Sequence, residues 1–135
     1  ATHMKGETLA AIVEIESEPV EKRYLAAKNL TWLRRCQNKE PLELSCLTLK
    51  GARILHMPGE LFVEYQLKAQ ELRPDLFVAM ASYGDYAPGY ICTEIAYTEG
   101  GYEASAMASL VDPGVEKVLT KAIRRLLGAE KKAAP

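Results

Sequence analysis

The spacing of hydrophobic residues divides the first half of the chain into helical and extended segments. Residues 20–37 are helix-forming, and Pro19 before them suits the first turn of a helix. Residues 9–15 fit either a strand or the lead-in to a helix, and periodicity leaves both open. Residues 42–49 alternate apolar and polar side chains. Lys50-Gly51 then forms a two-residue turn, and residues 52–57 return as the second strand of a predicted β-hairpin.

A helix and a buried strand are predicted next. Pro58-Gly59 closes the hairpin and opens a helix with a 3.6-residue apolar stripe, which ends before Pro74. Residues 76–82 form a continuous apolar run, which is typical of a strand buried on both faces. A strand, a helix and a buried strand in this order predict a βαβ unit with a right-handed crossover.

The last third of the chain combines irregular segments with one clear helix. Residues 83–89 are predicted as a loop, 90–93 as a short strand and 94–105 as irregular. Asp112-Pro113 provides an N-cap and a first helical residue for an amphipathic helix that ends before Gly128. The predicted fold class is α+β (or α/β): a small mixed sheet with a β-hairpin and a βαβ unit, and helices packed on it.

Composition narrows the class of protein without identifying it. The 135 residues include 17 Lys+Arg against 18 Asp+Glu, a net charge of −1, and 48% are hydrophobic. These values predict one globular domain over residues 5–128, followed by a polar tail, and give no general electrostatic case for binding nucleic acid. No uncharged run approaches the roughly 20 residues of a spanning helix, so no transmembrane segment is predicted. Residues 1–4 are typical of an expression-tag remnant.

Cysteine and histidine offer few sites for catalysis. The three cysteines, Cys36, Cys46 and Cys92, are odd in number and lack paired spacing, which argues against a disulfide framework. His56 is the one histidine beyond the first four residues, and no serine stands in a GxSxG motif. Zinc takes three or four protein ligands, mostly His or Cys. The residues by themselves therefore predict no complete catalytic site.

One carboxylate and a group of tyrosines remain as candidates. Glu60 is predicted in the first turn of a helix, where the helix dipole stabilises an acid without any function, and Glu64 shares that interpretation. Segments rich in tyrosine and glycine often line binding sites, although these rings could equally cover the edge of the core. The segment contains five tyrosines: Tyr83, Tyr86, Tyr90, Tyr97 and Tyr102.

Two segments of the sequence resemble the neutral/alkaline ceramidase family. One is ARILHMPGELFVE at residues 52–64; the other is GYICT at residues 89–93, followed by EGGYEAS at residues 99–105. In that family a short hydrophobic strand runs into Pro-Gly-Glu and a helix, and Tyr-Ile-x-Thr and Tyr-Glu-Ala follow. The closing amphipathic helix also fits, so the resemblance covers roughly residues 41–127.

The resemblance implies roles for three residues. Ceramidases of this family cleave the amide bond of ceramide with one zinc ion. By similarity, Glu60 and Tyr90 match a carboxylate and a tyrosine ligand of that zinc, and Tyr102 matches a tyrosine that stabilises the oxyanion at the substrate carbonyl. These roles are chemically coherent, because zinc activates water and a phenol can donate to a developing negative oxygen.

The sequence also departs from the family. The two histidine ligands lie upstream in the family, and nothing before residue 41 matches that region. His56 is not at a family ligand position, and the immunoglobulin-like domain that ends many members is absent. The resemblance therefore implies a C-terminal portion of a catalytic domain, with zinc in the complete protein and none in this chain alone. Its partners would be the missing N-terminal catalytic portion and a lipid amide substrate.

Two further expectations follow. If half of a larger domain is missing, an apolar patch should be exposed near Glu60 and Tyr90, and the chain could form a homo-oligomer. The alternative is a non-catalytic α/β module that binds a partner or small ligand through its tyrosine segment.

Overall fold

The computed structural model describes residues 4–85 and 88–129. Contacts between Cα atoms divide the chain into two compact units, Ala1–Pro41 and Leu42–Pro135, called here the N-terminal and C-terminal units. The residues with predicted chemistry all lie in the C-terminal unit.

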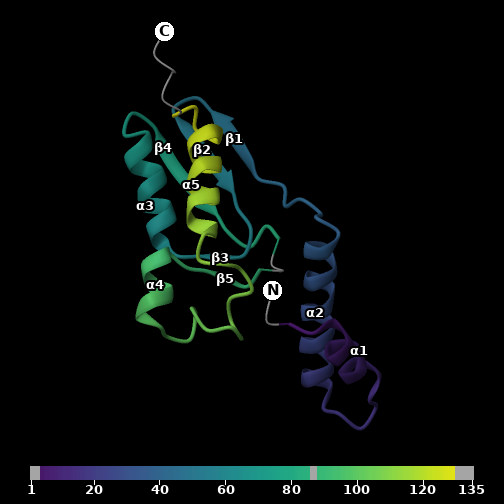
Figure 1. The fold of residues 1–135 in the computed structure, drawn as a ribbon. Helices are drawn as coiled ribbons and strands as arrows, with labels where there is room; N and C mark the ends of the chain where they lie inside the picture. The colour runs from purple at the N-terminus through teal and green to yellow at the C-terminus, as the bar shows by residue number, and fades with distance from the viewer. Residues whose placement is uncertain (1–3, 86–87, 130–135) are drawn as a thin grey trace. The chain divides into compact units, whose positions relative to one another are not determined.

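The N-terminal unit consists of two helices, α1 (Gly6–Glu14) and α2 (Val20–Gln37) (Figure 1). The helix predicted over residues 20–37 is confirmed, and residues 9–15 belong mostly to α1. The Arg23 side chain donates from Nε to the carbonyl of Val13 at 3.0 Å, which connects the two helices. Trp32 is buried in α2.

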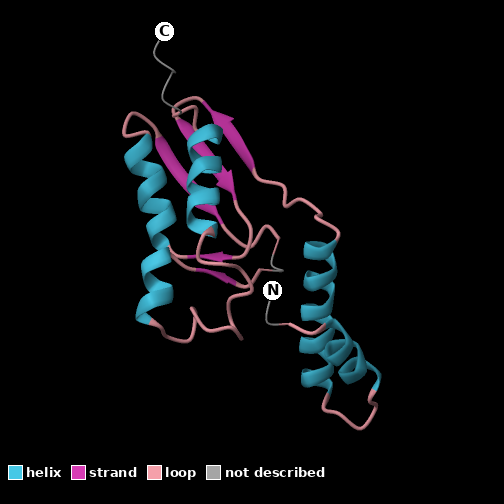
Figure 2. Ribbon diagram, viewed as in Figure 1, coloured by secondary structure: helices cyan, strands magenta, loops and turns pink. Residues whose placement is uncertain are grey.

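The C-terminal unit is an α+β structure with two small sheets (Figure 2). The larger sheet has the order β1-β2-β4, with β1 antiparallel and β4 parallel to β2, and the smaller one pairs β3 with β5 in parallel. This arrangement confirms the predicted small mixed sheet. In chain order, the elements are β1 (Ser45–Leu49), β2 (Ala52–His56), β3 (Glu60–Leu61), α3 (Val63–Leu72), β4 (Phe77–Ala81), β5 (Tyr90–Ile91), α4 (Glu94–Glu99) and α5 (Val115–Leu126).

The β-hairpin and the strand–helix–strand unit form as predicted. Leu49 pairs with Ala52 across the Lys50-Gly51 turn, where Gly51 has φ +76°. This left-handed conformation is accessible to glycine without steric cost. Strands β2 and β4 are parallel, and α3 connects them.

The hydrophobic core lies between the three-stranded sheet and helices α3 and α5, which pack on one of its faces (Figure 1). Strand residues such as Leu55 and Val78 meet helix residues such as Ala69 and Ile123 there. The most deeply buried members of the core are Leu55, Met57, Tyr65, Ala69, Val78, Ile91, Leu119, Ile123 and Leu127.

The other face of the three-stranded sheet is apolar and exposed. Strand register places Leu49, Ala52 and Phe77 in one row across it and Leu47, Ile54 and Ala79 in the next. The prediction that residues 76–82 are buried on both faces is wrong, because Phe77 is 67% exposed. The alternating burial of β4 arises because α3 and α5 pack on the opposite face only, as far as the described residues show.

Two further predictions of local structure are wrong. Residues 94–105 are not wholly irregular, since they include α4, whose first turn is capped by the Thr93 side chain accepting from the Ala96 amide at 3.4 Å. The helix predicted directly after Pro58-Gly59 begins instead at Val63, and Glu60 belongs to strand β3. At Glu60, strand pairing with β5 outweighs the stabilisation that an acidic side chain gains near a helix N-terminus.

Arg73 joins the ends of α3 and α5. Its Nη1 donates to the carbonyl of Leu127 at 2.7 Å, while Nε and Nη2 donate to the two Oδ atoms of Asp75, each at 2.8 Å. These hydrogen bonds lower the pKa of Asp75 from 3.8 to about 2. A lowered pKa means that the ion pair stabilises the fold above pH 3.8 and that this contribution is lost as the pH falls towards 2.

We therefore predict that the Asp75 carboxyl titrates near pH 2 in the folded chain, as measured by carbon-13 NMR. In the Arg73→Gln variant its midpoint should move up towards 3.8. An equal midpoint in both chains would show that the Arg73 guanidinium does not lower the pKa of the Asp75 carboxyl.

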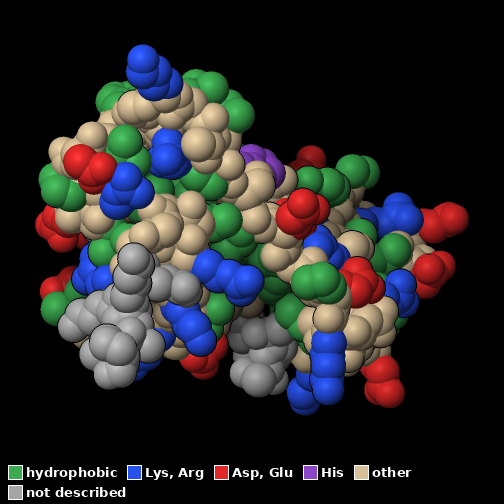
Figure 3. All heavy atoms as spheres, turned by 90° about the horizontal axis from the view of Figure 1, so that it is seen from above, with side chains coloured by type: hydrophobic (Ala, Val, Ile, Leu, Met, Phe, Trp, Pro, Cys, Tyr) green, Lys and Arg blue, Asp and Glu red, His purple; other side chains and the backbone are tan. Residues whose placement is uncertain are grey.

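The described surface carries both signs of charge. Acidic and basic side chains are interspersed on the face drawn in Figure 3. Among the described residues, no helix combines the length and the apolar character needed to cross a membrane.

Candidate functional site

Backbone pairing brings Glu60 and Tyr90 side by side. The two residues are register partners in the parallel β3–β5 pair. The Glu60 amide donates to the carbonyl of Gly89 at 2.9 Å, and the Phe62 amide donates to that of Ile91 at 3.1 Å. Since paired residues of neighbouring strands project from the same face of a sheet, their side chains meet. The opposite face of β5 carries Ile91, which is buried in the core.

Two glycines permit this close approach of the backbone. Gly59 and Gly89 both have left-handed φ angles, +60° and +67°. A Cβ on Gly59 would lie 2.6 Å from the carbonyl oxygen of Gly89, and a Cβ on Gly89 would lie 2.3 Å from that of Ala108. Both distances are shorter than real Cβ contacts. The glycines that precede Glu60 and Tyr90 therefore fix the position of both candidate ligands.

Two phenols, Tyr83 and Tyr90, contact the Glu60 carboxylate. The Tyr83 hydroxyl donates to Glu60 Oε2 at 3.3 Å. A hydrogen bond to Glu60, followed by the negative charge of that carboxylate, raises the pKa of Tyr90. The Tyr102 ring packs edge-on against the Tyr90 ring, with centroids 6.2 Å apart and planes at 78°. The structure thus brings together Glu60, Tyr90 and Tyr102, the three residues singled out in the sequence.

Negative charge nearby raises the pKa of Tyr83 and of Tyr90, which favours the protonated phenol in both. The charge of Glu60 is the main cause that raises the pKa of Tyr83, and Glu103 adds to the rise at Tyr90. Because a phenol must lose its proton to become a strong metal ligand, binding of a cation would have to offset this effect. No role was predicted for Glu103, although it lies in the Tyr-Glu-Ala motif beside Tyr102.

Two further tyrosines form hydrogen bonds in the segments next to β5. The Tyr65 hydroxyl donates to the carbonyl of Cys92 at 3.0 Å, and Tyr97 shares a 2.7 Å hydrogen bond with the Ser109 hydroxyl. Burial is the main cause that raises the pKa of Tyr65 and of Tyr97. The Tyr90 amide donates to the carbonyl of Ala108 at 3.0 Å. The main chain of β5 is therefore hydrogen-bonded on both sides, to β3 and to Ala108.

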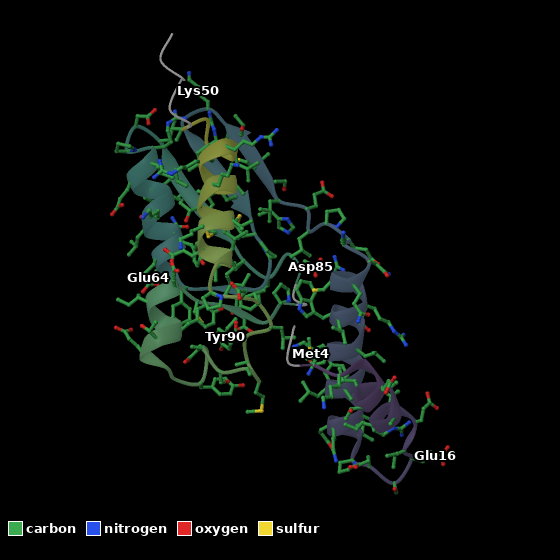
Figure 4. All side chains as sticks on the ribbon, in the orientation of Figure 1. Met4, Glu16, Lys50, Glu64, Asp85 and Tyr90 are labelled. Carbon is green, nitrogen blue, oxygen red and sulfur yellow. The ribbon has the colours of Figure 1, made fainter. Side chains whose placement is uncertain are left out.

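The remaining candidates lie elsewhere. His56 is exposed and its ring lies against Gly84, where an added Cβ would be 2.3 Å from Nε2. Cys92 is buried, and Tyr86 lies outside the described residues. Glu64 is in the first turn of α3, apart from Tyr90 (Figure 4).

A groove of about 560 Å³ opens between α3, α4 and α5. Its walls do not include Glu60, Tyr90 or Tyr102. They are formed by Glu64, Tyr65, Lys68, Thr93, Glu94, Ile95, Thr98, Glu116 and Thr120. Two acidic residues of the groove already have partners: Glu94 is paired with Lys117 at 3.0 Å, and Glu116 accepts from the Glu94 amide at 2.5 Å. These contacts occupy much of the hydrogen-bonding capacity of the groove walls.

The paired acid and phenol are two oxygen donors, fewer than the four ligands that a zinc ion commonly takes. Zinc accepts carboxylate oxygen among its usual ligands and is commonly four-coordinate. Glu60 and Tyr90 offer two adjacent oxygen atoms. Within residues 4–85 and 88–129, no group of three or more His, Cys, Asp or Glu side chains is placed to hold a metal ion.

Comparison with known proteins gives no family assignment. No family model matches the chain, and no match was found among curated proteins or solved structures.

Proposed function

We propose that the C-terminal unit contributes half of the active site of a ceramidase-like zinc amidohydrolase. Glu60 and Tyr90 act as two of the metal ligands, and Tyr102 acts as the oxyanion donor. The observation that carries the proposal is the meeting of these three residues, which the sequence separates, through the β3–β5 pair and the Tyr90–Tyr102 ring contact. The resemblance to the ceramidase family supplies the reaction class.

Each residue has a defined task in this proposal. When bound, zinc supplies Lewis-acid polarisation and an activated water. Glu60 would hold the metal through its carboxylate, and Tyr90 would hold it through its phenol oxygen. Tyr102 is 61% exposed, so its hydroxyl can reach a substrate carbonyl and donate to the negative oxygen that develops there.

The missing half of the site consists of imidazole ligands from an upstream portion of the complete protein, by resemblance two histidines. Two oxygen ligands alone bind zinc weakly and do not activate water usefully. We therefore expect this chain by itself to be inactive. The substrate class, by resemblance, is a lipid amide.

Removing a ligand tests the proposal in the complete protein. Glu60→Gln and Tyr90→Phe should each weaken zinc affinity by about tenfold or more, since each removes a direct bond to the metal. Zinc affinity is measured by competition with a chelating dye, and turnover by release of fatty acid from a ceramide substrate. Turnover should fall in both variants.

Glu64→Gln is the matched control, because it removes an exposed carboxylate from the neighbouring helix start. It should leave zinc affinity and turnover unchanged. If Glu60→Gln and Tyr90→Phe behave like Glu64→Gln, the ligand assignment is wrong.

A non-catalytic binding module is the second candidate function. It is favoured by two exposed rings, Tyr83, which contacts Glu60, and Tyr102, which contacts Tyr90, since phenols near a carboxylate suit an organic cation. On this alternative, the complete protein would show no amide hydrolysis that depends on Glu60, so the same variants distinguish the two functions.

A further inference from the structure

Tyr83 has an unusual backbone conformation for its residue type. Its φ is +65°, and among the described residues only Lys39 shares a positive φ without being glycine. The left-handed region costs a residue with a Cβ roughly 1–2 kcal/mol. Such conformations persist where the surrounding structure enforces them, and they concentrate at functional sites.

Hydrogen bonds enforce this conformation. The Tyr83 amide donates to the carbonyl of Gly59 at 2.8 Å, and the Gly59 amide donates to that of Asp85 at 2.8 Å. The Gly84 amide donates to the carbonyl of Met57 at 2.9 Å. The loop after β4 is thereby attached to the residues directly before Glu60.

The side chain of Tyr83 is largely exposed and contacts Glu60 through its hydroxyl. Tyr83 is 60% exposed, so little hydrophobic burial selects its orientation. Its hydroxyl nevertheless lies 3.3 Å from Glu60 Oε2. The strained backbone therefore directs a phenol from the end of β4 to a carboxylate on β3.

We propose that Tyr83 is a positioning residue that orients the Glu60 carboxylate for metal binding. The inference rests on the proposed function and extends it to a residue to which the family resemblance gives no role. A ligating carboxylate that accepts a fixed hydrogen bond loses less rotational freedom when it binds metal. Outer partners of this kind commonly contribute tenfold to a hundredfold in metal affinity.

Tyr83→Phe in the complete protein tests this role, because it removes the hydroxyl and keeps the ring and the backbone strain. Zinc affinity, measured by chelator competition, should fall about tenfold. The thermal midpoint of the zinc-free protein should stay unchanged, because the ring is kept and the lost hydroxyl contact is exposed to solvent.

Tyr97→Phe is the matched control. It also removes one phenol hydroxyl, but that hydroxyl is bonded to Ser109 and does not contact Glu60. We expect it to lower the thermal midpoint and leave zinc affinity unchanged. Opposite responses of affinity and stability in these two variants distinguish positioning from general structural support.

The outcomes separate this inference from the proposed function. If Glu60→Gln weakens zinc binding and Tyr83→Phe does not, the positioning role is refuted and the ligand assignment stands. If Tyr83→Phe lowers affinity only together with the thermal midpoint, its role is structural and the inference is wrong. If neither variant affects zinc, the proposed function fails, and the positioning role fails with it.

Discussion

The substitution Gly89→Ala is expected to destabilise the C-terminal unit by about 4 kcal/mol or more, the range of severe single mutations. Two causes combine at this position. The φ of +67° disfavours any residue with a Cβ, and the new Cβ would lie 2.3 Å from the carbonyl oxygen of Ala108. That carbonyl accepts from the Tyr90 amide, so it cannot move without breaking the attachment of β5.

Gly51→Ala is its matched control, because it separates the conformational cost from the steric clash. Gly51 has a similar φ of +76°, but nothing lies within 4 Å of the added Cβ. We expect a loss of about 1–2 kcal/mol, the cost of the left-handed region alone. Urea unfolding, followed through amide NMR signals of the C-terminal unit, measures both variants. Equal losses would show that the structure places Gly89 too close to Ala108.

Leu55→Ala should cost about 3–4 kcal/mol, because it leaves a cavity in the centre of the core. Leu55 is fully buried between the three-stranded sheet and helices α3 and α5. The same urea experiment measures the loss.

Leu47→Ala, on the neighbouring strand β1, is the matched control for Leu55→Ala. Leu47 is 56% exposed on the outer face of the same sheet. Its loss should cost less than about 1 kcal/mol, as is usual at exposed positions. If the two variants lose similar stability, the sheet is covered on both faces and its outer face is not open.

Local signals made much of the fold predictable. Helical spacing of apolar residues predicts the boundaries of α2, and glycine after lysine predicts the two-residue hairpin turn. The apolar run after a helix predicts that β4 returns parallel to β2. Helix α4 could also have been predicted, because Thr93 followed by Glu94 is a common helix start. The tyrosines and glycines around it led instead to an irregular assignment.

The β3–β5 pair could not be predicted from periodicity. Each strand has two residues, too few for an alternating pattern, and their pairing depends on contact between Gly59 and Gly89. The sequence therefore placed Glu60 in a helix, while the family resemblance singled it out together with Tyr90. Tyr83 stood among five tyrosines, and only its backbone conformation and its contact with Glu60 distinguish it.

The support of positions 60 and 90 by glycine and main-chain hydrogen bonds has a practical consequence for redesign. Because main-chain atoms align the two positions, their side chains can be exchanged without loss of the pairing that aligns them. Under the proposed function, histidine at one or both positions would replace an oxygen donor by a nitrogen donor. The preference of the site among transition metals would change with the donor atom.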